Sequence, residues 1–174
     1  MSNTILISVF APDRTGLVAA ITATLFDLGA NLASTNFSVL GNAAEFTAVA
    51  EIPVDVSFDD IQNDLNQIEV LENAKITISP FDMKTTADPT GKVTHKIAVS
   101  GGDRPGLIAR LCEVFVQFKA NIVRMNAERV PSIAGDQYIV SFFVWIPEDT
   151  AQTCLATISN TAGGLNLSCT WENI

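Results

Sequence analysis

The sequence is poor in the side chains that most enzyme chemistry requires. It has a single histidine, His95, and its three cysteines lie scattered over the second half of the chain without a Cys-x-x-Cys motif. A lone histidine that alternates with apolar strand residues gives no basis for a Ser-His or Cys-His pair. We therefore expect no catalytic residues, no metal site and no cofactor, and we expect buried thiols at Cys112, Cys154 and Cys169.

Basic residues are also scarce, and the chain is strongly acidic. Ten Lys and Arg stand against nineteen Asp and Glu, which gives a net charge of −9 and a pI near 4.4. This charge repels the phosphates of nucleic acids and of anionic membranes. No apolar run reaches the roughly 18 residues of a membrane span, and the N-terminus has no basic signal-peptide region. We expect a soluble, cytoplasmic protein that binds neither nucleic acid nor membrane directly.

What the sequence does contain is an internal repeat at an offset of 90 residues. The stretch Asp13-Arg14-Thr15-Gly16-Leu17 returns as Asp103-Arg104-Pro105-Gly106-Leu107. At the same offset Asn31 matches Asn121 and Asn36 matches Asn126, without a gap. A repeat of this length predicts two domains, over residues 1–81 and 93–174, joined by a linker of polar composition at 82–92.

The hydrophobic pattern predicts the same order of elements in both halves. In the first half, alternating strands are expected at 4–10, 31–40, about 45–52 and 75–81, with helices at 15–28 and 58–68. The second half repeats this order, with strands at 93–99, 121–130, 137–146 and 165–171, and helices at 105–118 and 150–159. The order βαββαβ predicts an α+β fold of two ferredoxin-like plaits, each a four-stranded antiparallel sheet with two helices on one face.

The repeated motif lies at the turn from the first strand to the first helix of each half. Asp13 is expected to cap the helix, and Gly16 allows a backbone or a ligand to approach its first turn. Free N–H groups and the helix dipole favour an anion at that point. The alternative is a structural cap and turn without any ligand. Because the helix is roughly 20 Å long, Asp13 and Asn31 lie at opposite ends of one unit, and only a neighbouring module can bring such residues together.

One face of the second predicted sheet is more apolar than its counterpart. Where the open face of the first half carries Thr47 and Glu51, that of the second carries Ile139, Ser141, Phe143 and Trp145. Large aromatics on an open sheet face favour an interface. The alternative is a strand that is merely more apolar. Asn36 and Asn126 are expected on the same face, at an interface or bonded to the neighbouring turn. The predicted interface residues are Asn36, Asn126, Ile139, Phe143 and Trp145, and the large apolar share of the chain favours a homodimer.

The Asp-Arg-x-Gly-Leu turn, the Gly-Ala-Asn step at 29–31 and the βαββαβ order resemble the ACT domain family. Two such domains fill the chain, as in transcriptional repressors of the glycine cleavage system. The resemblance implies amino-acid sensing without catalysis, by a dimer that acts through a protein partner such as a transcription regulator. It also suggests glycine or another small amino acid as ligand, and a role in glycine or one-carbon metabolism.

The resemblance further implies which residues bind the ligand: backbone groups of the turn would hold a carboxylate, and the asparagine would meet a polar group across an interface. The implied residues are Asp13, Arg14, Thr15, Gly16, Leu17 and Asn31 in the first half, and Asp103, Arg104, Gly106, Leu107 and Asn121 in the second. The second half departs from the pattern, since Lys119 replaces Gly29 and Pro105 lacks the N–H of Thr15. The first site is therefore favoured.

Two other functions compete with the sensor. The first is a protein-interaction module that binds no ligand, which the sequence alone does not separate from a sensor. The second is an acylphosphatase-like hydrolase, since Arg14 and Asn36 could supply its arginine and asparagine. Against the hydrolase, the chain has no glycine-rich phosphate cradle, and Asp13 beside Arg14 would weaken a phosphate site.

Overall fold

The structure is a computed structural model that describes residues 2–84, 88–131 and 135–174. It divides into two compact units, Met1–Thr85 and Thr86–Ile174. We call them the first and the second unit and describe each by itself. The first unit holds most of the negative charge, with eleven acidic residues against three basic ones, whereas the second has eight against seven.

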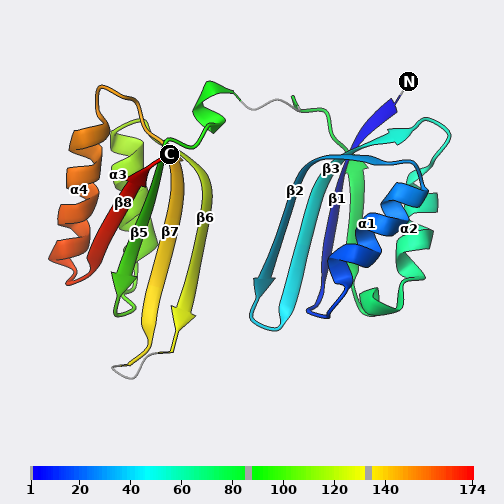
Figure 1. Ribbon diagram of the computed structural model, residues 1–174, viewed down its shortest axis with the longest axis horizontal. Coiled ribbons are helices and arrows are strands. Elements are labelled where there is room, and N and C mark those ends of the chain that lie inside the picture. Colours follow the sequence, from blue (N-terminus) through cyan, green and yellow to red (C-terminus); the bar gives the residue numbers. More distant parts are fainter. Residues whose placement is uncertain (1, 85–87, 132–134) are drawn as a thin grey trace. The chain divides into compact units, whose positions relative to one another are not determined.

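The first unit is a four-stranded antiparallel sheet with its helices on one face (Figure 1). The strand order is β2-β3-β1-β4, so the hairpin that follows the first helix pairs next to β1 and leaves β2 as an edge. The elements are β1 (Ser2–Pro12), α1 (Leu17–Asp27), β2 (Asn31–Leu40), β3 (Ala43–Pro53), α2 (Phe58–Asn66), the 3-10 turn η1 (Glu69–Leu71) and β4 (Lys75–Pro80).

The second unit repeats this fold, with the strand order β6-β7-β5-β8 (Figure 1). It begins with a 3-10 turn, η2 (Pro89–Gly91), inside the predicted linker, of which residues 85–87 lie outside the described part. The elements that follow are β5 (His95–Gly101), α3 (Leu107–Gln117), β6 (Asn121–Val130), β7 (Gln137–Trp145), α4 (Ala151–Gly164) and β8 (Ser168–Asn173). The predicted α+β fold of two ferredoxin-like plaits is confirmed.

Each unit has a core of its own between sheet and helices. In β3 the alternating residues Phe46, Ala48, Ala50 and Ile52 are buried, as the period of two predicted. The helices supply Leu17, Ile21 and Leu25 to this core in the first unit. In the second unit Phe115 of α3 meets Phe142 of β7 edge to face, with ring centroids 5.2 Å apart. No helix in the described part of the chain is long and apolar enough to cross a membrane.

Two details of the prediction are wrong. Asp13 does not cap α1, because the helix begins three residues later than a cap at Asp13 requires, with Gly16 at the cap position and no side-chain bond. In the second unit α4 runs on through Gly163 and Gly164, so β8 begins at Ser168 rather than at 165. Residues 132–134, between the predicted strands 121–130 and 137–146, lie outside the described residues.

The first helix of each unit, α1 or α3, ends in a left-handed turn, but a different residue makes the turn in each. Gly29 adopts a φ of 75° after α1, and Lys119 adopts a φ of 56° after α3. The N–H of the next residue then bonds back into the helix, from Ala30 to the Leu25 carbonyl and from Ala120 to the Phe115 carbonyl, both at 2.9 Å. A left-handed conformation costs a residue with a Cβ about 1–2 kcal/mol, so Lys119 is strained where Gly29 is not.

We predict that Lys119→Gly raises the free energy of unfolding of the second unit by about 1 kcal/mol, because it removes this strain. Urea unfolding followed by tryptophan fluorescence measures it directly, since Trp145 and Trp171 both belong to the second unit. Lys119→Ala is the control, because it removes the charge and keeps the Cβ. Equal stability of the glycine and alanine variants would contradict the prediction.

His95, the only histidine of the chain, should make the free energy of unfolding of the second unit depend on pH. His95 is 9% exposed on the helix side of β5, and its Nδ1 lies 2.8 Å from the Thr94 hydroxyl. Burial lowers the pKa of His95 below its ordinary value of 6.5. The unfolded chain therefore binds a proton more readily than the folded one, so stability should fall as the pH drops through about 6.5.

We expect the wild-type second unit to be less stable at pH 5.5 than at pH 7.5, in urea unfolding followed by tryptophan fluorescence. In the His95→Gln variant, whose side chain stays neutral, the difference in the free energy of unfolding between the two pH values should be smaller. An unchanged difference in the variant would assign the pH dependence to other groups.

Candidate functional site

The repeated turn has the same backbone geometry in both units. Gly16 has a φ of 89° and Gly106 a φ of 78°, and each occupies the cap position of its helix without a side-chain hydrogen bond. A Cβ added to either glycine would meet no atom within 4 Å. The glycine is therefore required for the left-handed conformation and not for packing within its own unit.

This geometry leaves the first helical turn open. The first backbone bond of α1 runs from Ala20 to the Gly16 carbonyl, at 2.9 Å, and that of α3 from Arg110 to the Gly106 carbonyl, at 3.0 Å. Within the described residues, no backbone carbonyl accepts from the N–H of Val18 or Ala19, nor from their counterparts Ile108 and Ala109. Two N–H groups per helix are thus available to an acceptor from outside.

A hollow lies over each of these turns. In the first unit it measures about 380 Å³ and is lined by residues 13–19 together with Phe37 of β2. In the second it measures about 220 Å³ and is lined by residues 103–109 together with Tyr138 of β7. The structure thus brings together the predicted Asp13, Arg14, Thr15, Gly16 and Leu17, and likewise Asp103, Arg104, Gly106 and Leu107. A helix N-terminus with free amides in a hollow suits a small anion such as a carboxylate.

The aromatic wall of each hollow was not predicted, and it comes from a different strand in each unit. Phe37 is 41% exposed and pairs with Phe46 across the β2–β3 hairpin. Its repeat counterpart is Ala127, and the second unit uses Tyr138 of the following strand instead. The tight turn at Gly41-Asn42 fixes the pairing of Phe37 with Phe46, so this signal was present in the sequence.

The arginines of the motif do not pair with the aspartates beside them. Arg14 reaches η1, where its Nη1 donates to the Glu69 carbonyl at 3.1 Å and its Nη2 lies 3.9 Å from Glu72 Oε2. Asp103 pairs with Arg129 of β6, and Arg104 forms no ion pair with a described residue. The side chain of Arg14 therefore points toward its own unit, while its backbone remains part of the hollow.

The matched asparagines lie at the far end of each unit, as the helix length predicted. Asn31 pairs with Glu51 across the sheet, whereas the N–H of Asp13 donates to the Asn42 carbonyl at 2.9 Å. Asn42 and Glu51 are nine positions apart along the extended chain, which is about 30 Å. The Asn121 amide donates to the Thr90 carbonyl of η2 at 2.9 Å, whereas the Asn31 side chain bonds to no described residue.

The open face of the second sheet is partly covered by its own side chains. Ile139, Phe143 and Trp145 are half-buried, and the guanidinium carbon of Arg124 lies 3.9 Å from the centre of the Phe143 ring. Asn36 and Asn126 are exposed on the open faces, opposite Thr47 and Ser141, and bond to no described side chain or turn. These five interface residues remain a prediction.

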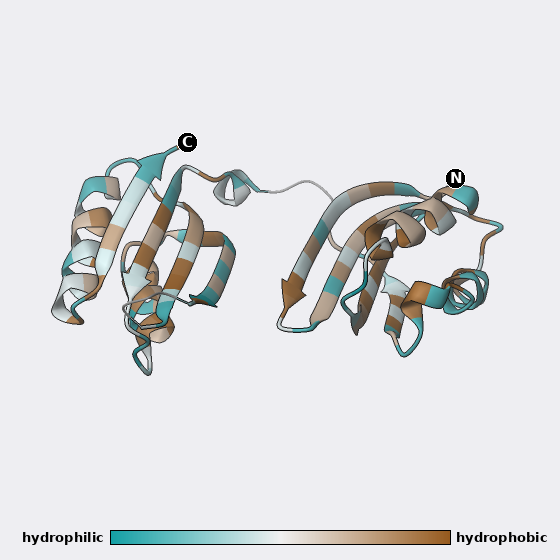
Figure 2. Cartoon of the chain, turned by 60° about the horizontal axis from the view of Figure 1, so that its bottom comes forward, coloured by the Kyte–Doolittle hydropathy of each residue, from teal (hydrophilic) through white to brown (hydrophobic). Residues whose placement is uncertain are grey.

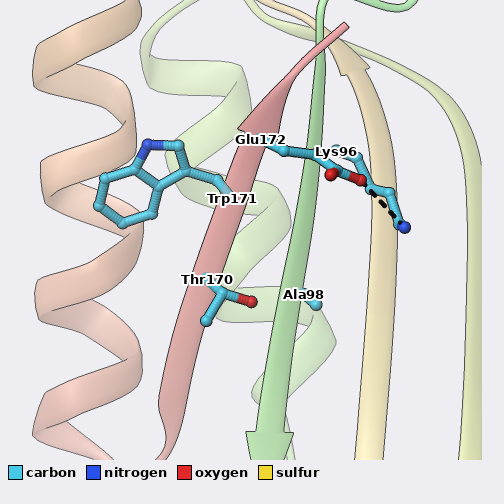
Figure 3. A pocket seen from close by; sticks show the side chains of 5 residues that line it. All are labelled: Lys96, Ala98, Thr170, Trp171 and Glu172. Atoms are coloured by element: carbon cyan, nitrogen blue, oxygen red, sulfur yellow. Dashed lines mark ion pairs between the residues drawn. The ribbon is translucent and has the colours of Figure 1, made fainter.

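A further hollow of about 280 Å³ lies on this open face, between β5 and β8 (Figure 3). Lys96 Nζ lies 3.1 Å from Glu172 Oε1 there, while the indole of Trp171 turns away toward α4. The two charges pair with each other, so neither Lys96 nor Glu172 offers an unpaired charge to a ligand in this hollow. The thiol of Cys154 is fully buried, which raises its pKa to about 11 and makes it inert.

Comparison with known proteins identifies the fold. Residues 3–76 match the model of the ACT domain family. The structure of a protein of unknown function from Galdieria sulphuraria superposes with a TM-score of 0.77 at 19% sequence identity, over 100% of this chain and 99% of the other. The structure of a proposed glycine cleavage system transcriptional repressor superposes with a TM-score of 0.65 at 12% identity, over 100% and 98%. No curated protein matches the sequence.

The two structural matches span both units of the chain, and the family match covers most of the first unit. These findings agree with the repeat of the Asp-Arg-x-Gly-Leu turn and with the two βαββαβ units. Residues 3–76 are therefore similar to the ACT domain family, and both units have an ACT-like fold.

Proposed function

We propose that this protein is a non-catalytic sensor of a small amino acid, in which the first unit holds the ligand. ACT domains are regulatory modules, and the present chain has two units of that fold. The observation that carries the proposal is the hollow over the α1 turn. It joins two unpaired helical N–H groups to an aromatic wall in a chain whose only histidine is buried elsewhere.

The ligand carboxylate would accept from the N–H groups of Val18 and Ala19. These groups lie at the positive end of the helix dipole, and each charge-assisted bond of this kind is stronger than a neutral one. The flanking Asp13 is exposed and acidic, which suits the ammonium group of an amino acid better than a second anion. Phe37 would lie beside the ligand's Cα and any apolar side chain, which suits a small apolar amino acid, and the family resemblance favours glycine.

Asn31 would complete the site from a neighbouring module. In the edge strand β2 none of the ten residues is charged, and its end is hydrophobic, with Val39 49% and Leu40 57% exposed (Figure 2). Such an edge favours pairing with another strand. Full antiparallel pairing of β2 with the β2 of a second copy would set Asn31 beside Leu40, next to the Gly41-Asn42 turn whose Asn42 carbonyl accepts the Asp13 N–H.

The second unit supports weaker binding, or none. Pro105 removes one backbone donor from its turn, and its Asn121 is already bonded to η2. Its edge strand β6 also carries Arg124, Glu128 and Arg129, and charges on an edge discourage pairing. Regulation through a protein partner, in glycine or one-carbon metabolism, is part of the proposal and draws on the resemblance to the glycine cleavage repressor.

We expect one or a few small amino acids to raise the melting temperature of the full chain in a thermal-shift panel of all twenty. A ligand at 100 times its dissociation constant adds about 2.7 kcal/mol, which is roughly 5–10 °C for a chain of this size. Asn31→Ala should abolish the shift, whereas the matched Asn121→Ala should retain it.

A flat panel, with both variants as stable as the wild type, would contradict the sensor and favour an interaction module without a ligand. A shift that Asn121→Ala abolishes and Asn31→Ala leaves intact would move the site to the second unit.

A further inference from the structure

The contact between Arg14 and η1 connects the candidate ligand turn to a distant part of the first unit. Arg14 lies between Asp13 and Gly16, in the lining of the hollow. Its side chain is 35% exposed and ends on Glu69 and Glu72, which are 55 and 58 residues further along the chain. One residue thus touches both the turn that would hold a ligand and the segment that joins α2 to β4.

The segment at the other end of this contact is short and lies over the core. Leu71 of η1 is 4% exposed and packs into the core of the first unit. Two residues later Asn73 adopts a left-handed φ of 66°, a conformation that few residues adopt, before β4 begins at Lys75. The segment packs on the core through Leu71, with Ile68 and Ala74 beside it, and its contact with Arg14 links it to the α1 turn. A change in that contact can therefore shift this short segment.

The surface around η1 is strongly acidic. Residues 55–72, which include α2 and η1, carry six acidic side chains and no Lys or Arg. The guanidinium of Arg14 is the one basic group that a described contact brings to this surface, since it pairs with Glu72. Movement of Arg14 would therefore change both the position of η1 and the local charge.

The second unit lacks this connection. There α4 runs unbroken from Ala151 to Gly164, with no 3-10 turn between α4 and β8. The side chain of Arg104, the repeat counterpart of Arg14, forms no hydrogen bond or ion pair with a described residue. The same motif therefore occurs twice in the chain, once with the contact and once without it, which supplies a matched control.

We propose that Arg14 is a positioning residue that transmits amino-acid binding at the α1 turn to η1 and the acidic surface beside it. The proposal rests on the proposed function, because it takes the turn to be the ligand site. A carboxylate that settles on the N–H groups of Val18 and Ala19 lies in the hollow that Arg14 lines, and it attracts the same guanidinium that holds Glu69 and Glu72. Binding thereby alters the contact between Arg14 and η1. The acidic surface beside η1 changes with it, and a protein partner would bind that surface differently.

Hydrogen–deuterium exchange of the full chain tests this, with Arg14→Gln and Arg104→Gln compared with wild type. Arg14→Gln is expected to speed exchange severalfold at residues 69–74 as well as in the turn. Arg104→Gln should change only the turn at 103–107 and leave α4 as it was. Arg14→Lys, which keeps the charge and one donor, should restore part of the protection. Unchanged exchange at 69–74 in Arg14→Gln would overturn the contact on which the proposal depends.

A second comparison adds glycine at millimolar concentration as the probe. Wild type should show changed exchange both at residues 15–19 and at 69–74, while Arg14→Gln should keep the change at 15–19 and lose it at 69–74. Changes in both segments of the variant would overturn the transmitting role, since binding would reach η1 by another route. If neither glycine nor any other amino acid changes residues 15–19 of wild type, the proposed function fails, and with it the transmission.

Discussion

The left-handed glycine at the start of the first helix is the constraint on which each unit depends. Gly16 and Gly106 turn the chain from strand to helix without a capping side chain, so the second and third helical N–H groups have no backbone acceptor among the described residues. A side-chain cap at this position would have satisfied these groups and closed the turn. The helix start thus departs from the usual capping rule, and such departures are expected where local rules yield to function.

The two units show how one fold can be kept while its site changes. Both units bury alternating strand residues at matching positions, and both end the first helix in the same left-handed turn. Lys119 adopts that left-handed conformation in the second unit, although it suits Gly29 better. Around the site, however, the aromatic wall moves from Phe37 to Tyr138, and the asparagine of the second unit is bonded within its own unit. A shared core with a changed turn is what we expect if the first unit binds the proposed ligand and the second unit serves a structural role.

Much of the fold could be predicted because its signals are local. Strands β2 and β6 have the predicted bounds, 31–40 and 121–130. A helix end and a hairpin turn delimit β2, and the repeat places β6 at the matching residues. The cap at Asp13 could not be excluded from sequence, because only the left-handed φ of Gly16 shows that the helix begins later. The helix predicted at 150–159 continues through Gly163 and Gly164, although glycine disfavours a helix interior. The contact of Arg14 with η1 spans 55 residues and has no local signal.

The central claim is that the amides of the first turn of α1 hold an amino-acid carboxylate, and an NMR titration tests it most directly. In ¹H–¹⁵N spectra of the full chain, titrated with glycine and then with the other amino acids, the amides of Val18 and Ala19 should show the largest shifts. Their counterparts Ile108 and Ala109 should move less or not at all. If an amino acid binds and leaves Val18 and Ala19 unmoved, or if none of the twenty moves them, the account is contradicted.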